Sequence, residues 1–307
     1  MTAQGEMQSQ VRKIIGSATD GTFNENMYLL AKEEGSTATD LNGAMIDFFR
    51  GRLNVSDGGL DDLQAQFAAQ FGFAQWNGLN QVIPDDYAIW IDSDDASRIT
   101  FGTSTAVAAY SDKSGNGVTI SQGTAASQPN YNATGLNSKG IFEFSTDRLD
   151  TNVSLNLTSG ITAFVLVSSI TNSGTEDYIV GQWAASGNNR QFHISKTAGT
   201  NIFQAVFSTD GAASVIIAGD VTSPGQVLTF THNGINAGAV YLNGVFKNFN
   251  VGDIKPTGTS NLTIGALNSA GGGAFVGGVG AVIIYTRLLS DGERTQVERY
   301  LMNKYGL

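Results

Sequence analysis

Apolar and polar positions alternate in short runs from about residue 85 to the end of the chain. Alternation with a period of two is typical of a half-buried β-strand, because successive side chains of a strand point to opposite faces. Phe142-Glu143-Phe144 shows this pattern clearly. The runs are separated by clusters of Gly, Asn, Ser and Thr, which mark turns. We therefore expect about thirteen strands, at 87–91, 118–121, 140–144, 161–170, 177–183, 190–196, 202–207, 214–217, 226–232, 239–242, 245–249, 261–264 and 275–285.

No helical pattern separates these strands, which excludes a parallel α/β fold and predicts a mainly β, antiparallel sandwich. Asn243-Gly244 lies between two apolar runs and predicts a β-hairpin, because both residues tolerate the positive φ of a type I′ turn. One helix is expected at the C-terminal end. Its start has the capping-box pattern Ser290-x-x-Glu293. The apolar side chains expected to pack it against the sandwich are Val297, Leu301 and Tyr300 or Tyr305.

The first 84 residues have a different, helical periodicity. Phe23, Met27 and Leu30 follow the i, i+4, i+7 spacing of one helix face, while Asp40 and Asp57 can cap further helices. Helices this short are marginal alone in water, so they must pack on each other or on a partner. Pro84 marks the change of pattern. We expect a helical anchoring region at 1–84 and a β-sandwich at 85–307.

The composition agrees with a turn-rich β-protein. Charged residues make up 14% of the chain and 38 residues are glycine, against typical values of about 25% charged and about 7% glycine. The net charge is −10, and no basic stripe is present to neutralise phosphates. Nucleic-acid binding is therefore not expected.

Cysteine is absent and only two histidines occur, His193 and His232, which excludes disulfides and thiolate metal sites. His193 alternates within an expected strand, where it should be exposed or hydrogen-bonded. No basic segment followed by an apolar core is present at the N-terminus, and no stretch of about 18 apolar residues occurs. We therefore expect no signal peptide and no membrane insertion. This pattern suits a protein made in a host cytoplasm.

Several motifs follow one another along the chain in this order: the turn-rich loop 110–117, the segment 135–144, the strand 162–167, the hairpin 241–245, the segment 262–266 and the closing strand and helix. In this order they resemble the concanavalin A-like, laminin-G-type jelly-roll domains found in many phage structural proteins. The resemblance covers about residues 85–307. It implies a concanavalin A-like jelly roll with a surface or binding role, and it does not by itself specify a function.

Some members of this family bind calcium through loop oxygens, which points to Asp112 and Asn116 as candidate calcium ligands. Calcium takes about 6–8 oxygen ligands, several of them usually carboxylates. The loop offers one carboxylate, and Lys113 adds a repulsive charge. The alternative is a turn in which Asp112 and Asn116 bond to nearby backbone amides.

Glycosidases need two carboxylates that face each other across a cleft. The candidate acids are separated or flanked by loop residues rather than arranged in one Glu-x-Asp-x-Glu run: Glu143, Asp147, Glu176 and Asp177. Neither histidine lies in a recognisable nucleophile context. We therefore predict a protein that is not an enzyme.

The segment 181–190 is the best candidate for a ligand-binding surface. Trp183 can stack on a sugar ring, while Asn188, Asn189 and Arg190 can bond its hydroxyl groups. The alternative is that the tryptophan belongs to the core or to a subunit interface and that the asparagines form an ordinary turn.

Together these observations favour a phage virion protein without enzymatic activity. Residues 1–84 would bind other virion proteins, and the jelly roll would form an exposed decoration or fibre domain that can bind a host-surface glycan. Exposed virion modules are usually symmetric, so we expect a homo-oligomer, with a trimer favoured. The alternatives are a carbohydrate-binding adhesin and a polysaccharide-degrading enzyme.

Overall fold

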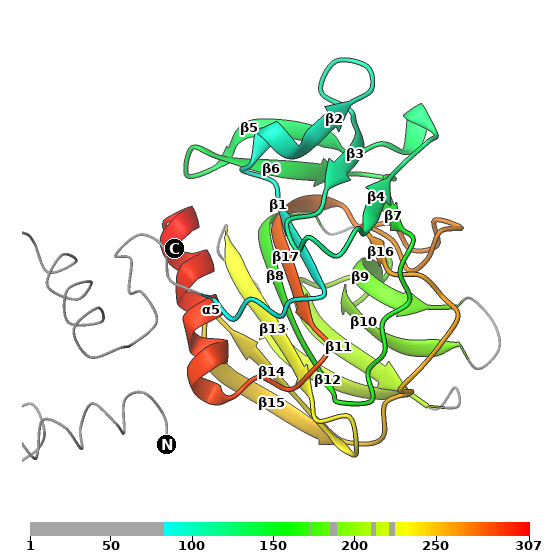
Figure 1. Cartoon of the computed structure of the whole chain (residues 1–307), viewed down its shortest axis with the longest axis vertical. Helices are drawn as coiled ribbons and strands as arrows, with labels where there is room; N and C mark the ends of the chain where they lie inside the picture. The colour runs from blue at the N-terminus through cyan, green and yellow to red at the C-terminus, as the bar shows by residue number, and fades with distance from the viewer. Residues whose placement is uncertain (1–82, 172–173, 185–188, 210–212, 221–224) are drawn as a thin grey trace, which may run out of the picture. The chain divides into compact units, whose positions relative to one another are not determined.

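The computed structural model describes residues 83–171, 174–184, 189–209, 213–220 and 225–307. Their strands form two sheets with one α-helix at the C-terminal end (Figure 1). Strand neighbours in both sheets are antiparallel. The predicted mainly β sandwich with a C-terminal helix is confirmed. The predicted helical anchoring region lies, up to Val82, outside the described residues.

The first sheet has eight strands, of which seven follow the order β15-β14-β13-β8-β17-β6-β5, and β1 pairs with β17. Their bounds are β1 Ile89–Asp92, β5 Asn130–Leu136, β6 Lys139–Phe144, β8 Ile161–Ile170, β13 Gln226–His232, β14 Ala237–Leu242, β15 Val245–Val251 and β17 Gly277–Tyr285.

The second sheet has nine strands in the order β12-β11-β10-β9-β16-β7-β4-β3-β2. Their bounds are β2 Ile99–Phe101, β3 Val107–Ser111, β4 Thr119–Ser121, β7 Leu149–Thr151, β9 Asp177–Trp183, β10 Arg190–Lys196, β11 Ile202–Ser208, β12 Ala213–Asp220 and β16 Thr263–Ile264. Two single-turn 3₁₀ helices, Ala96–Arg98 and Ala125–Ser127, lie in the connections.

The strand predictions are confirmed where the apolar pattern is strong. Strands β8, β9, β10 and β13 have the predicted bounds, and the hairpin turn Asn243-Gly244 has φ of 49° and 76° as expected. Four strands were not predicted: β2, β3, β5 and β7. They are short or rich in polar and small residues, so their pairing depends on the neighbouring strands rather than on their own pattern. The loop predicted to start at Tyr110 begins after Ser111, since β3 includes both residues.

The main core lies between the two sheets and consists mostly of Val, Ile, Leu and Phe side chains. Phe230 of β13 stacks on Phe192 and Phe207 of the second sheet, with both ring centroids 6.0 Å away. Such aromatic contacts add to the burial of apolar area, the main force that holds the layers together.

Helix α5, Asp291–Tyr305, packs on the other side of the first sheet, against β13 and β8. The predicted capping box is present, since Ser290 and Glu293 bond to each other's backbone N–H groups. Val297, Leu301 and Tyr305 are buried in a second apolar cluster, against which Tyr300 packs. Within the described ranges, no helix combines the length and the hydrophobicity needed to span a bilayer.

Candidate ligand-binding site

The second sheet turns one face to the core and the other face away from the first sheet. One row of paired residues across four strands lies in the core: Val180, Ile194, Ala205 and Ile216. Because side chains alternate along a strand, the neighbouring row points away from the core. That row is also in register: Gly181, His193, Val206 and Val215. We call this side of strands β9–β12 the outer face.

His193 lies at the middle of the outer face, between two aromatic rings of β9. Its ring centroid is 4.8 Å from that of Tyr178 and 4.7 Å from that of Trp183, both in edge-on geometry. His193 is only 4% exposed, so of the two expected alternatives, an exposed or a hydrogen-bonded histidine, the exposed one is wrong. Burial lowers the pKa of His193 to about 3, and its Nδ1 atom has no hydrogen-bond partner among the described residues. The ring is therefore neutral at physiological pH.

Glu176, just before β9, accepts hydrogen bonds from three neutral side chains, which lie on three adjacent strands. Its Oε1 accepts hydrogen bonds from Ser195 Oγ at 2.9 Å and from Gln204 Nε2 at 2.6 Å. Its Oε2 accepts a hydrogen bond from the hydroxyl of Tyr178 at 2.9 Å. We call these four residues the Glu176 cluster. Ser195 is buried at its base, whereas the other three side chains are partly exposed.

The structure brings two of the predicted glycan-contacting residues together. Trp183 ends β9 and Arg190 begins β10, where they are cross-strand partners. The guanidinium carbon of Arg190 lies 5.6 Å from the centroid of the Trp183 ring. Trp183 is 7% exposed, so little of its ring is open for stacking on a sugar. The backbone carbonyl of Asn189 accepts hydrogen bonds from Ala184 and Ser260.

Asn188 lies outside the described residues. The predicted four-residue site therefore remains a prediction. In its described part, Trp183 is buried and Arg190 is partly exposed. Sequence reasoning missed the Glu176 cluster, because neither Ser195 nor Gln204 lies in a motif that indicates a binding site. Only the pairing of β9, β10 and β11 brings them to the carboxylate.

Asp112 and Asn116, the predicted calcium ligands, join their loop to the first strand. Asp112 Oδ1 accepts a hydrogen bond from the Trp90 backbone N–H at 2.8 Å, and its Oδ2 accepts one from Ser114 Oγ. Asn116 Nδ2 donates to the carbonyl of Tyr87 at 2.9 Å. The backbone bonds join Asp112 and Asn116 to residues 22 and 29 positions away rather than to nearby backbone amides, so they fix the loop on the segment around β1. The calcium site stays a prediction. No group of three or more His, Cys, Asp or Glu side chains in the described part of the chain is placed to hold a metal ion.

The candidate catalytic acids do not form one site. Glu143 is exposed on β6 of the first sheet, where it accepts a hydrogen bond from Asn132. Asp147 bonds to the backbone and hydroxyl of Ser145 in its own turn. Asp177 pairs with Lys196 at 3.3 Å, and both side chains are fully buried. Glu176 therefore has no facing carboxylate among these residues.

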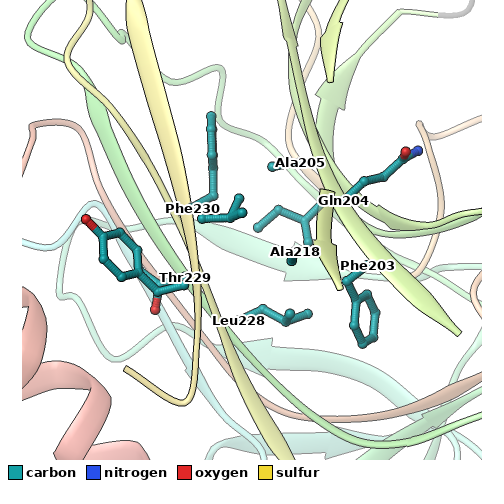
Figure 2. A pocket seen from close by; sticks show the side chains of 10 residues that line it. Phe203, Gln204, Ala205, Ala218, Leu228, Thr229 and Phe230 are labelled. Atoms are coloured by element: carbon teal, nitrogen blue, oxygen red, sulfur yellow. The ribbon is translucent and has the colours of Figure 1, made fainter. Parts of the chain in front are cut away.

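A cavity lies between the sheets, bounded on one side by β10–β12 and on the other by β13 and β14 (Figure 2). Its volume is about 10 Å³, which is at the lower limit for a single water molecule. Figure 2 shows the amide of Gln204 pointing away from it, toward the outer face. The cavity is a packing gap in the core and is too small for a sugar.

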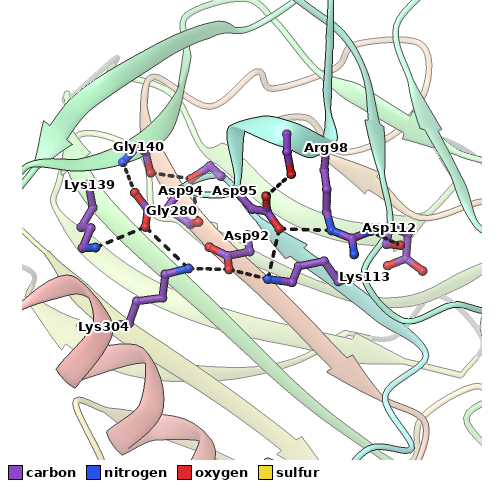
Figure 3. Close-up of polar contacts among 12 residues, drawn as sticks. Asp92, Asp94, Asp95, Arg98, Asp112, Lys113, Lys139, Gly140, Gly280 and Lys304 are labelled. Atoms are coloured by element: carbon purple, nitrogen blue, oxygen red, sulfur yellow. Dashed lines mark hydrogen bonds and ion pairs between the residues drawn. The ribbon is translucent and has the colours of Figure 1, made fainter. Parts of the chain in front are cut away.

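A second polar cluster, which no pattern in the sequence predicts, joins the first strand to the last helix. Asp92 of β1 is 1% exposed and forms ion pairs with Lys113 Nζ at 3.0 Å and with Lys304 Nζ at 2.5 Å (Figure 3). Asp94 bonds to Lys139 at 3.4 Å and to the backbone N–H of Gly140. All of these charges are paired within the cluster, so its role is to hold α5 and the loop after β3 against β1.

Comparisons with known proteins agree with this fold. Residues 144–293 match the family model described as the concanavalin A-like lectin/glucanases superfamily. No curated protein matches the chain.

Solved structures with the same fold include two binding domains. The binding domain of botulinum neurotoxin serotype D matches with 13% identity and a TM-score of 0.51 over 71% of this chain and 51% of that chain. The binding domain of Paraclostridial Mosquitocidal Protein 1 matches with 14% identity and a TM-score of 0.52 over 71% of this chain and 52% of that chain. This chain spans about half the length of these structures. Its sandwich is similar in fold to them and, over residues 144–293, similar in sequence to the concanavalin A-like lectin/glucanases superfamily.

Proposed function

We propose that the β-sandwich is a carbohydrate-binding domain without enzymatic activity and that its outer face meets the glycan. The observation that carries this proposal is the Glu176 cluster, four polar side chains that are fixed on the sheet by their mutual hydrogen bonds and of which three are partly exposed. Preorganised polar groups reduce the entropy lost when a ligand binds. Arg190, at the start of β10, is partly exposed and lies over the Trp183 ring at the same face.

The similarity to the lectin/glucanase superfamily over residues 144–293 supports this proposal. The separate positions of Glu143, Asp147 and Glu176 favour binding over hydrolysis, since a glycosidase needs two carboxylates facing one scissile bond. Tyr178 adds an aromatic ring beside the polar groups. Sugar-binding sites combine these two kinds of contact, because a sugar ring has an apolar face and a rim of hydroxyl groups.

A glycan array tests the proposal, performed with and without calcium. We expect binding to at least one glycan class, and its loss in Arg190→Met and Gln204→Ala variants. The matched control is Arg299→Met, which removes an exposed arginine of α5 and should bind as the wild type does. A blank array would contradict the proposal, and so would full binding by both outer-face variants. Release of sugars from a bound polysaccharide, abolished in Glu176→Gln, would instead establish an enzyme.

We also propose that the protein is a phage virion component, with residues 1–84 binding other virion proteins and the sandwich exposed as a decoration or fibre domain. The two-part organisation of the sequence and the family resemblance support this assignment. Its test is the presence and copy number of the protein in purified particles. A chain lacking residues 1–84 should fail to incorporate, and the full chain should be a homo-oligomer, with a trimer favoured. A monomer whose truncated form still incorporates would overturn the proposal.

A further inference from the structure

The hydrogen-bonding protons of the Glu176 cluster are all in use within the cluster. The single hydroxyl proton of Tyr178 goes to Glu176 Oε2, and that of Ser195 goes to Glu176 Oε1. The amide of Gln204 has two protons. It donates to Glu176 Oε1 at 2.6 Å and to Ser195 Oγ at 3.1 Å. No donor of these side chains is left for a ligand.

The cluster can therefore offer a ligand only hydrogen-bond acceptors. Tyr178 Oη and Gln204 Oε1 keep lone pairs, and Glu176 Oε2 accepts one hydrogen bond where a carboxylate oxygen has room for about two. These three side chains are partly exposed, whereas Ser195 is buried beneath them. A ligand that bonds here must supply donors.

The charge of the cluster restricts the class of ligand further. The three donors to Glu176 are neutral, so they stabilise the carboxylate without cancelling its charge. In the described ranges, no lysine or arginine lies within ion-pair distance of Glu176. Lys196 follows Ser195 in sequence, but its ammonium is buried and paired with Asp177 at 3.3 Å. A partly buried carboxylate without a cationic partner favours a cation.

We propose that the Glu176 cluster is a subsite for a protonated amine, and that the ligand class is an amino sugar with a free ammonium group. An ammonium has three donors and no acceptor, which suits a cluster whose unused groups are all acceptors and whose net charge is negative. This inference rests on the proposed function, since it names the sugar class that the outer face takes.

The experiment compares two trisaccharides with the same backbone, one of glucosamine and one of N-acetylglucosamine, by calorimetry at slightly acidic pH. N-acetylation converts the ammonium into a neutral amide. We expect the glucosamine trimer to bind at least about tenfold more tightly, in line with a hydrogen bond to a charged group. Raising the pH until the amine is neutral should remove the difference.

Glu176→Gln should abolish the preference for the amine, and Tyr178→Phe should reduce it, with folding of both variants checked by thermal unfolding. The matched control is Glu143→Gln, which removes an exposed carboxylate from the first sheet and should keep the preference. Equal binding of both trimers would overturn the subsite, and so would an equal loss in the Glu143 variant, which would indicate a general attraction to the acidic surface.

The two proposals fail in different ways. Neutral glycans that bind on the array, together with no preference for the amine, would overturn the amine subsite and leave the carbohydrate-binding function standing. Binding of the amine trimer through Glu176, with no neutral glycan bound, would support both proposals and restrict the ligands to amino sugars. A blank array, together with no binding of either trimer, would overturn the carbohydrate-binding function and the subsite with it.

Discussion

The hydroxyl of Tyr305 lies 3.1 Å from Oδ1 of Asp92, across a sequence separation of 213 residues. The same hydroxyl lies 2.5 Å from the carbonyl oxygen of Gly280 in β17. Tyr305 is fully buried, and burial raises the pKa of its phenol well above the usual value. The last turn of α5 is thereby fixed to β1 and β17, so the helix is an integral part of the sandwich.

Removing this hydroxyl should destabilise the whole domain. We expect Tyr305→Phe to lower the free energy of unfolding by about 1–3 kcal/mol, because a buried charged acceptor loses a donor. Urea denaturation followed by fluorescence measures the change. The control is Tyr300→Phe on the same helix, whose hydroxyl has no hydrogen-bond partner among the described residues. Equal effects of the two substitutions would mean that the contact with Asp92 contributes nothing.

Acid should weaken the start of α5. Bidentate hydrogen bonds from Arg287 lower the pKa of Glu293 to about 2, from an ordinary value of 4.5. Because the folded protein holds this carboxylate deprotonated, its stabilisation is complete above about pH 4.5 and is lost as the pH falls toward 2. Glu293→Gln should be less stable at pH 7 and should lose less stability over this pH range. Both side chains are about one-third exposed, so solvent screening keeps the effect small. Parallel pH profiles of the two proteins would contradict the assignment.

Gly265 should tolerate no side chain. Its φ is +85°, and a Cβ atom would lie 2.3 Å from Phe144 Cδ1 and 2.9 Å from the carbonyl oxygen of Asp147. We expect Gly265→Ala to cost about 2–4 kcal/mol, from backbone strain and overpacking together. Gly292→Ala is the matched control, because Gly292 is helical with open space around it and the change should stabilise by up to about 1 kcal/mol. Thermal unfolding of both variants checks the prediction, and an unchanged midpoint for Gly265→Ala would refute it.

The loop after β3 should be indifferent to calcium. Both oxygens of Asp112 already accept hydrogen bonds from Trp90 and Ser114. We expect Asp112→Ala to destabilise by about 1–2 kcal/mol, since the Trp90 N–H loses its acceptor, and to do so equally in EDTA and in millimolar calcium. A wild-type midpoint that rises with calcium, and a loss of that rise in the variant, would establish a calcium site at Asp112 and Asn116.

Patterns within short segments determined much of the fold. Alternating apolar positions predicted β8, β9, β10 and β13 with their bounds, Asn243-Gly244 predicted a hairpin, and Ser290 with Glu293 predicted the start of α5. These features depend on residues that are close in sequence, where propensity and periodicity act directly. Strand β5, with its polar Asn-Tyr-Asn start, shows the limit of such patterns, because its own residues do not predict its pairing with β6.

The candidate site was decided by tertiary structure. The sequence singled out Trp183 as a sugar-stacking residue, but the fold buries its ring between Arg190 and His193. Glu176 and Gln204 are 28 residues apart and meet only because β9, β10 and β11 are adjacent and in a particular register. Local alternation tells which residues share a face of one strand. The order and register of the strands, which fix the neighbours across that face, follow from how the whole core packs.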